Sequence, residues 1–268
     1  MRWRAVFIGL GALLLIAFYT TSDAAAINHN HALSALDFWG AAVCHRLTDR
    51  SLVIAGRQLP LCARCSGMYL GVLLVFLVTF LAGRERWAAL PRLPLLLALL
   101  GLVGVMGVDG FNSYSHFFPN FPHLYEPQNW LRLATGMGTG LTLGLVLVPS
   151  LAQTLWQTPQ WQPSVQSWGE LAGLALLGGS LVLLALSNQP AVLYVLAFVS
   201  SVGLLLILTA INTMLLLIAR RREGRCATWR QALPWLGAGV LLALAELSLG
   251  AWLRLSLFGT LTGLPGLA

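Results

Sequence analysis

The segment "CARCSGMYLGVLLVFLVTFLA", residues 62–82, decides the fold. From residue 66 to residue 82 it contains no charged side chain. Roughly 17–25 apolar residues in a helix cross the hydrocarbon core of a bilayer, so this run predicts a transmembrane helix over 66–82. Cys62 and Cys65 stand directly before the run as a Cys-x-x-Cys motif. The segment therefore predicts reactive side chains at one end of a membrane-spanning helix.

The composition extends this prediction to the whole chain. Hydrophobic residues make up 57% of the 268 residues, charged residues only 9%, and the mean hydropathy is +0.78. A soluble domain carries about 25% charged residues, so this chain cannot cover a soluble surface. We predict an all-α integral membrane protein with about seven transmembrane helices. The predicted spans are 5–21, 66–82, 93–109, 131–149, 169–187, 191–218 and 234–256.

Three regions follow from these spans. Residues 1–26 combine a basic start, an apolar run and the small residues Ala24 and Ala26, as in a secretory signal. We favour an uncleaved signal anchor over a cleaved peptide, because the run is long for a signal peptide. Residues 27–65 form an extracytoplasmic segment rich in Cys, His and Arg, and residues 66–268 form a six-helix membrane domain.

The basic residues predict the orientation, and all 16 of them are arginine. Ten fall on one side of the predicted membrane: Arg2, Arg4, Arg84, Arg86, Arg92, Arg220, Arg221, Arg222, Arg225 and Arg230. Six fall on the other: Arg46, Arg50, Arg57, Arg64, Arg132 and Arg254. The positive-inside rule then places the N-terminus in the cytoplasm of a bacterial cell and residues 27–65 outside its plasma membrane. No motif supports a nucleic-acid partner, so we interpret the +7 formal charge as a topology signal and as anion contacts.

The outer side gathers the candidate metal ligands. The stretch "SLVIAGRQLP", residues 51–60, predicts a short hairpin with Gly56 at its bend. That hairpin would return Cys44 and His45 onto Cys62 and Cys65, and thiolates and imidazole are the ligands that zinc prefers. The start of the helix also favours thiolates at Cys62 and Cys65. We therefore predict a Zn²⁺ site formed by Cys44, His45, Cys62 and Cys65.

The ligand set leaves alternatives open. Cys44 and His45 are neighbours, and two adjacent ligands on one ion are uncommon. If only one of them binds, three protein ligands and an open position would suit a catalytic metal. Otherwise a residue from the next outer loop could complete the site, the candidates being His116, His123, Glu126 and Asp109.

Redox chemistry and structural roles are the competing interpretations of the cysteines. A Cys-x-x-Cys at the outer end of a helix is also used by membrane thiol oxidases. Cys44 is the only further cysteine on the predicted outer side, so a relay of two cysteine pairs cannot be built. An odd number of outer cysteines also fits a disulfide framework poorly. We rank a metal site first, ahead of redox thiols and of structural or inert cysteines.

A second polar group lies at the predicted ends of neighbouring spans. Asp109 ends one span, and Asn129 and Arg132 begin the next. Asp109 and Arg132 could pair and simply tie two helices together. Together with Arg64, they could instead bind and process an anion, because arginine matches the oxygens of phosphate and carboxylate.

Three features within the spans carry separate predictions. Gly136, Gly140 and Gly144 recur every four residues and predict a smooth face for close helix packing. Asn212 is expected to form a hydrogen bond between helices. Glu246, in the middle of a span, indicates a function by default; otherwise it is protonated or paired, for instance with Arg254.

The chain also resembles a known family. The similarity is carried by Cys44-His45-Arg46, Arg50-Ser51, Gly56, Gln58-Leu59-Pro60, Cys62-x-Arg64-Cys65, Gly67-x-Tyr69-x-Gly71, Asp109-Gly110 and Asn129-x-x-Arg132-x-x-Thr135-Gly136. These residues resemble the signature of an uncharacterised prokaryotic membrane family, domain of unknown function two thousand and eighty-five, over about residues 40–145. The resemblance implies a polytopic membrane protein and draws attention to the motif residues, without supplying a reaction.

These observations lead to one expected function. The protein would bind zinc at the outer face, and its function would be either metal-assisted chemistry on a membrane-associated anionic substrate, such as a lipid phosphate or another lipid-linked anion, or metal binding itself. Arg64 and Arg132 would orient the anion, and Asp109 would serve as a base or as a partner to the metal ligands. The alternatives are a thiol–disulfide oxidoreductase using Cys62 and Cys65, a transporter, and a non-catalytic accessory subunit.

Overall fold

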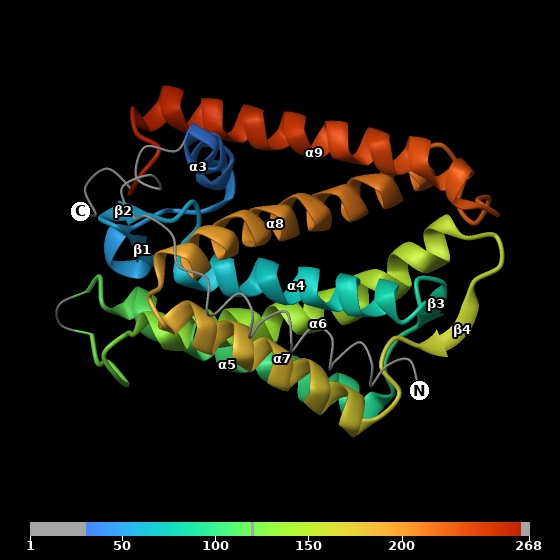
Figure 1. The fold of residues 1–268 in the computed structure, drawn as a ribbon, viewed down its shortest axis with the longest axis horizontal. Helices are drawn as coiled ribbons and strands as arrows, with labels where there is room; N and C mark the ends of the chain where they lie inside the picture. The colour runs from blue at the N-terminus through green and yellow to red at the C-terminus, as the bar shows by residue number, and fades with distance from the viewer. Residues whose placement is uncertain (1–30, 119–120, 264–268) are drawn as a thin grey trace.

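The computed structural model describes residues 31–118 and 121–263. Within them six long helices run back and forth beside one another (Figure 1): α4 (Ala63–Leu81), α5 (Leu93–Ser115), α6 (Asn129–Leu155), α7 (Trp168–Leu186), α8 (Pro190–Ala219) and α9 (Trp229–Phe258). All six are long and apolar enough to cross a membrane. The prediction of an all-α membrane protein is confirmed, and each of the six corresponds to a predicted span. The predicted span 5–21 lies outside the described residues.

The middle of the bundle is the pair formed by α4 and α6, and glycines bring their backbones together. A Cβ atom added to Gly67 would lie 2.9 Å from the backbone nitrogen of Met137 and would overlap the carbonyl oxygen of Leu133. A Cβ atom at Gly140 would overlap the carbonyl oxygen of Met68. The predicted packing face of α6 is therefore confirmed, and α4 supplies a matching glycine face of its own.

Pro149 lies inside α6, and the helix continues past it to Leu155. Proline has no N–H to donate to the carbonyl group four residues earlier, here that of Leu145. The hydroxyl group of Ser164 donates to the Leu145 oxygen instead, at 2.9 Å. Because this carbonyl group is satisfied from outside the helix, α6 extends beyond the predicted boundary at residue 149.

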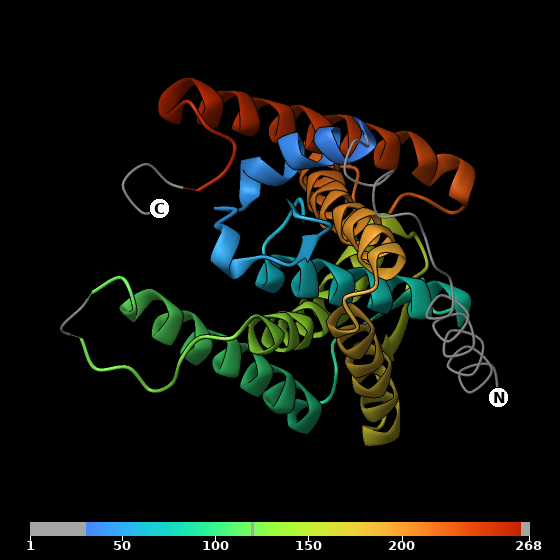
Figure 2. The same ribbon diagram turned by 60° about the vertical axis from the view of Figure 1, so that its left-hand side comes forward.

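The chain also forms a helix that the sequence did not predict, α3 (His31–Val43). It lies beside α9 at one edge of the bundle, while α5 and α7 lie at the opposite edge (Figures 1 and 2). The indole nitrogen of Trp39 donates to the Ser248 hydroxyl at 3.2 Å, and Ala42 packs closely on Gly250. The helix is too short to span a membrane, which is why a search for apolar runs passes over it.

The two ends of the bundle differ. At one end lie the 3₁₀ turn η1 (Thr48–Arg50) and the antiparallel strands β1 (Val53–Ile54) and β2 (Arg57–Gln58), with Gly56 at φ 81° between them. The predicted hairpin is thus confirmed, and we call this the hairpin end. At the other end β3 (Trp87–Ala89) pairs in parallel with β4 (Gln160–Pro163), which the sequence did not predict.

The arginines in the described part of the chain divide between these two ends as the predicted spans require. The six predicted for the outer side are at the hairpin end, whereas those that follow α4 or α8 are at the end with β3 and β4. The side of the membrane on which each end lies stays a prediction.

Candidate functional site

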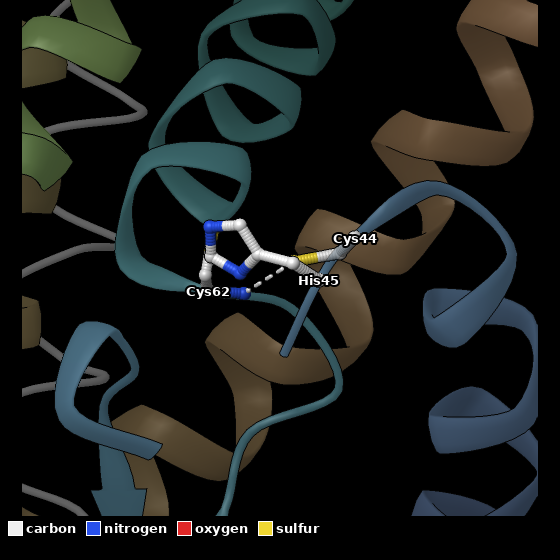
Figure 3. A group of neighbouring side chains, drawn as sticks. All are labelled: Cys44, His45 and Cys62. Atoms are coloured by element: carbon white, nitrogen blue, oxygen red, sulfur yellow. Dashed lines mark hydrogen bonds between the residues drawn. The ribbon is translucent and has the colours of Figure 1, made fainter. Parts of the chain in front are cut away.

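The candidate metal ligands meet where α3, the hairpin and α4 converge. Helix α3 ends at Val43, and Arg46 adopts the left-handed region at φ 49°, which turns the chain directly after His45. The hairpin then returns the chain to Cys62, the residue that caps the start of α4. As a result, ligand atoms of Cys44, His45 and Cys62 all lie within 4.8 Å of one another (Figure 3).

Arg254, near the end of α9, holds the turn that carries Cys44 and His45. Its guanidinium donates to the carbonyl oxygen of Ala41 at 2.9 Å and to that of His45 at 3.0 Å. It also donates to the carbonyl oxygens of Cys44 and Gly263. One side chain from α9 therefore fixes the backbone of two candidate ligands.

An ion-pair network around the buried Arg46 holds the same turn. Arg46 is 3% exposed, and its Nη2 lies 2.8 Å from Oδ1 of Asp37 on α3. The second carboxylate oxygen of Asp37 lies 2.8 Å from Nη2 of Arg57 on β2. Asp37 thus ties α3, the turn and the hairpin together, and both charges on Arg46 and Asp37 are compensated, as buried charges must be.

Hydrogen bonds favour a thiolate at Cys44. The backbone N–H of Cys62 donates to the Cys44 sulfur at 3.2 Å. Hydrogen bonds with the Cys62 and Cys65 side chains lower the pKa of the Cys44 thiol well below its ordinary value, although burial opposes this. The hydrogen bond to Cys44 in turn raises the pKa of the Cys62 thiol to about 12. The cluster therefore favours a single negative charge centred on Cys44, which a cation would stabilise.

Cys65 lies one turn into α4 and is not part of the compact group of three. Its partly buried side chain packs against the core cluster that contains Cys44 and Cys62. All four cysteines of the chain are free thiols, and Cys226 lies at the opposite end of the bundle beside Trp156. The structure brings three of the four predicted ligands into one compact group, with Cys65 packed beside it; the binding of an ion by these residues stays a prediction.

Asp109 pairs with Arg64 rather than with Arg132. The carboxylate is 2% exposed, forms an ion pair with the Arg64 guanidinium and accepts a hydrogen bond from the Tyr125 hydroxyl at 3.0 Å. Arg132 instead donates to Oδ1 of Asn129 at 2.8 Å. The suggested tie between Asp109 and Arg132 is therefore wrong, since the first turn of α4 presents an arginine closer to α5.

The other residues that could have completed the metal site lie in the loop after α5. The rings of His116 and His123 stack with their centroids 3.7 Å apart. His116 Nδ1 lies 2.8 Å from the carbonyl oxygen of Asn112, and His123 Nδ1 lies 3.2 Å from the Ser115 hydroxyl. Among the described residues, neither histidine joins the compact group around Cys44, nor do Glu126 and Asp109.

Glu246 has a different partner from the one suggested. Its Oε2 accepts a hydrogen bond from Nδ2 of Asn212 on α8 at 2.9 Å, which confirms the predicted hydrogen bond between helices at Asn212. Arg254 lies two turns further along α9 and is engaged with the carbonyl groups at the hairpin end. The sequence offered Arg254 as one possible partner of Glu246, where the structure has Asn212, and it gave no sign of the structural roles of Asp37 and Tyr125.

These features define the class of the molecule. A bundle of apolar helices with its cysteines, histidine and buried arginines gathered at one end is a multi-pass membrane protein. The family model described as "Predicted membrane protein (DUF2085)" matches residues 44–146, from Cys44 to the middle of α6. An uncharacterized protein of Methanothermobacter thermautotrophicus (strain Delta H) is 33% identical over 104 residues, which cover 39% of this chain and 83% of that protein. The chain belongs to this family. No solved structure matches it.

Proposed function

We propose that this membrane protein binds zinc through Cys44, His45, Cys62 and Cys65. The observation that carries the proposal is the compact group formed by Cys44, His45 and Cys62, with all three ligand atoms within 4.8 Å of one another. Ligand atoms around a tetrahedral zinc ion lie about 3.3–3.8 Å apart, given bond lengths near 2.0 Å to nitrogen and 2.3 Å to sulfur. Only small side-chain adjustments would close the group around an ion.

The activity that we propose is chemistry on a membrane-associated anionic substrate. If only one of the neighbours Cys44 and His45 is a ligand, the zinc ion has three protein ligands, keeps one position for water or substrate and acts as a Lewis acid. Arg64 stands between Cys62 and Cys65 in the sequence, and its guanidinium extends to Asp109 and Ser113 of α5. Arg64 and Arg132 would orient the anion. Asp109, which is bonded to Arg64 and Tyr125, would accept a proton or position the Arg64 guanidinium.

We place the site on the outer face of a bacterial plasma membrane. The support is the distribution of arginines, because the end with β3 and β4 carries the runs after α4 and α8 that the positive-inside rule assigns to the cytoplasm. The N-terminus would then be cytoplasmic, and the hairpin end would face outward toward lipid headgroups.

Elemental analysis of the purified protein tests the metal proposal. We expect about one zinc per chain in the unmodified protein and almost none in the Cys62→Ser/Cys65→Ser variant, because two thiolates are then lost from the ligand set. Cys226→Ser is the matched control, since it removes a buried thiol at the opposite end of the bundle. Equal and negligible zinc in all three proteins would refute the proposal.

A thiol–disulfide oxidoreductase is the second candidate, and the proximity of the Cys44 and Cys62 sulfurs, which lie within 4.8 Å of each other, favours it. The two candidates are distinguished by the treatment, a chelator or a reductant, that makes these thiols react with a maleimide. If zinc is bound, we expect a chelator to increase labelling of the cluster, while a reductant alone leaves it unchanged, because metal-bound thiolates are shielded without being oxidised. The converse result, labelling gained only with reductant, would favour the oxidoreductase and contradict the metal site.

A further inference from the structure

Three arginines from different elements converge on one residue of α5. Arg50 of η1 donates from Nη2 to the carbonyl oxygen of Ser113 at 3.0 Å. Arg64 of α4 donates to the Ser113 hydroxyl oxygen at 3.2 Å, and Arg132 of α6 donates from Nε to the same oxygen at 3.4 Å. Ser113 itself is 0% exposed. One neutral serine thus accepts hydrogen bonds from three guanidinium groups, whose positive charges still repel one another.

The charge of this arginine cluster is not balanced. Asp109 is the one carboxylate that forms an ion pair with it in the described part of the chain, and that pair engages Arg64. Asp49, exposed beside Arg50 in the sequence, adds only a weaker attraction. Counting the three arginines and the buried aspartate leaves a net charge of about +2 in this cluster, which is costly without a counter-ion.

The arginines show the effect of this crowding. Burial lowers the pKa of Arg50, and the neighbouring charge of Arg64 lowers it further. The Arg50 guanidinium also lies over the Phe117 ring, 4.1 Å from its centroid, so an aromatic face replaces a carboxylate partner there. Nε of Arg64 is buried and has no hydrogen-bond partner among the described residues. The cluster therefore has an unused hydrogen-bond donor, Nε of Arg64, and an excess of positive charge.

The surroundings add to the positive potential. Arg64 lies in the first turn of α4 and Arg132 in the first turn of α6. Neither helix has a side-chain hydrogen bond at its N-cap residue, so the positive ends of both helix dipoles remain uncapped near the cluster. A group with several negatively charged oxygens would meet guanidinium donors from three directions.

We infer that Arg50, Arg64 and Arg132 form a binding site for a phosphate monoester group. A phosphate monoester carries a charge of about −1.5 to −2 at neutral pH and three acceptor oxygens, which matches the number of arginines and their excess charge. A carboxylate has one charge and two oxygens and would leave one arginine unused. The inference rests on the proposed function for the view that the anion is a substrate, but binding itself needs no metal.

The same chemistry could come from a lipid headgroup or from free phosphate, and titration distinguishes them. We would titrate the detergent-solubilised protein by calorimetry with short-chain phosphatidic acid and, separately, with inorganic phosphate. Phosphatidylcholine of the same chain length measures the contribution of the acyl chains. Tighter binding of phosphatidic acid than of phosphate assigns the site to a lipid, and equal binding assigns it to the free anion; either result supports the inference.

Substitutions connect this binding to the cluster. We expect Arg50→Gln and Arg132→Gln each to weaken binding about tenfold to a hundredfold, the value of one charge-assisted hydrogen bond. Arg57→Gln is the matched control, because Arg57 lies at the same end but pairs with Asp37 and Ser34. Equal affinities of the Arg50, Arg132 and Arg57 variants would overturn the inference, as would the absence of binding by the unmodified protein.

Two further variants separate misfolding and metal loss from loss of the site. Asp109→Asn should tighten binding about fivefold, because it removes the carboxylate that competes for Arg64, and a misfolded protein could not show this gain. The Cys226→Ser variant should bind the anion as the unmodified protein does, because it removes a thiol at the opposite end of the bundle. The unmodified protein should also keep its anion binding after zinc is removed with a chelator. If zinc is absent from all variants while binding still depends on the arginines, the proposed function fails and the anion site stands. Weakened or unchanged binding in Asp109→Asn would count against the cluster as the site.

Discussion

The Gly140→Leu variant is expected not to form a folded membrane domain. A Cβ atom at this position would overlap the Met68 carbonyl oxygen and would lie 2.8 Å from the carbonyl carbon of Met68 and 2.9 Å from the Cα atom of Gly71. These are backbone atoms of α4, which cannot rotate away as the end of a side chain can. We expect the free energy of unfolding to fall by more than about 4 kcal/mol, since α4 and α6 would have to separate along their contact.

Gly104→Leu serves as the control for this prediction. Gly104 lies in α5 with an exposed position and nothing within 4 Å of an added Cβ atom. Size-exclusion chromatography in mild detergent and thermal melting would be compared for both variants. A Gly140→Leu protein that elutes and melts like Gly104→Leu would show that the α4–α6 contact is not needed for folding.

The Arg254→Gln variant is expected to weaken zinc binding about tenfold to a hundredfold, the effect usual for a residue that orients metal ligands. Arg254 is bonded to the carbonyl groups of Cys44 and His45 but is not itself a candidate ligand. Without its guanidinium, the turn that carries both ligands loses its attachment to α9. The measurement is a competition for zinc against a chelator of known affinity.

Arg230→Gln is the matched control, because it removes an exposed arginine from the first turn of the same helix at the opposite end. Arg254→Lys should restore little of the affinity, since an ammonium group cannot bond four carbonyl groups with the planar fork of arginine. Zinc affinities that are equal in the Arg254 and Arg230 variants would mean that α9 has no part in positioning the ligands.

The sequence predicts best those features that depend on local patterns. Apolar runs located six helices, and the glycine spacing of α6 located its packing face. The position of Gly56 located the bend of the hairpin that returns Cys62 to Cys44. Each of these depends on residues close together in the chain, so a pattern within one segment is enough to predict it.

Features that depend on distant segments could not be predicted in the same way. The sequence showed that Asp109 lies near a helix end. Only the arrangement of α4, α5 and α6 shows that it forms its ion pair with Arg64 rather than with Arg132. Arg254 could be matched with the nearest carboxylate in the sequence, whereas three of its four acceptors are more than two hundred residues away, at Ala41, Cys44 and His45. Backbone carbonyl groups leave no trace in a pattern of side chains, so such a partner is invisible before the fold is known.

The attachment of the Cys44–His45 turn to α9 has a thermodynamic consequence. Cys62 and Cys65 belong to α4, so an ion bound by all four residues would join the outermost helix pair, α3 and α9, to the centre of the bundle. Thermodynamic linkage makes this effect mutual. Any change that detaches α9 from the turn lowers the affinity for the ion. Removal of the ion then weakens the attachment of α9 to the turn by the same factor. The metal centre would therefore stabilise the packing of the helices in addition to any chemical role.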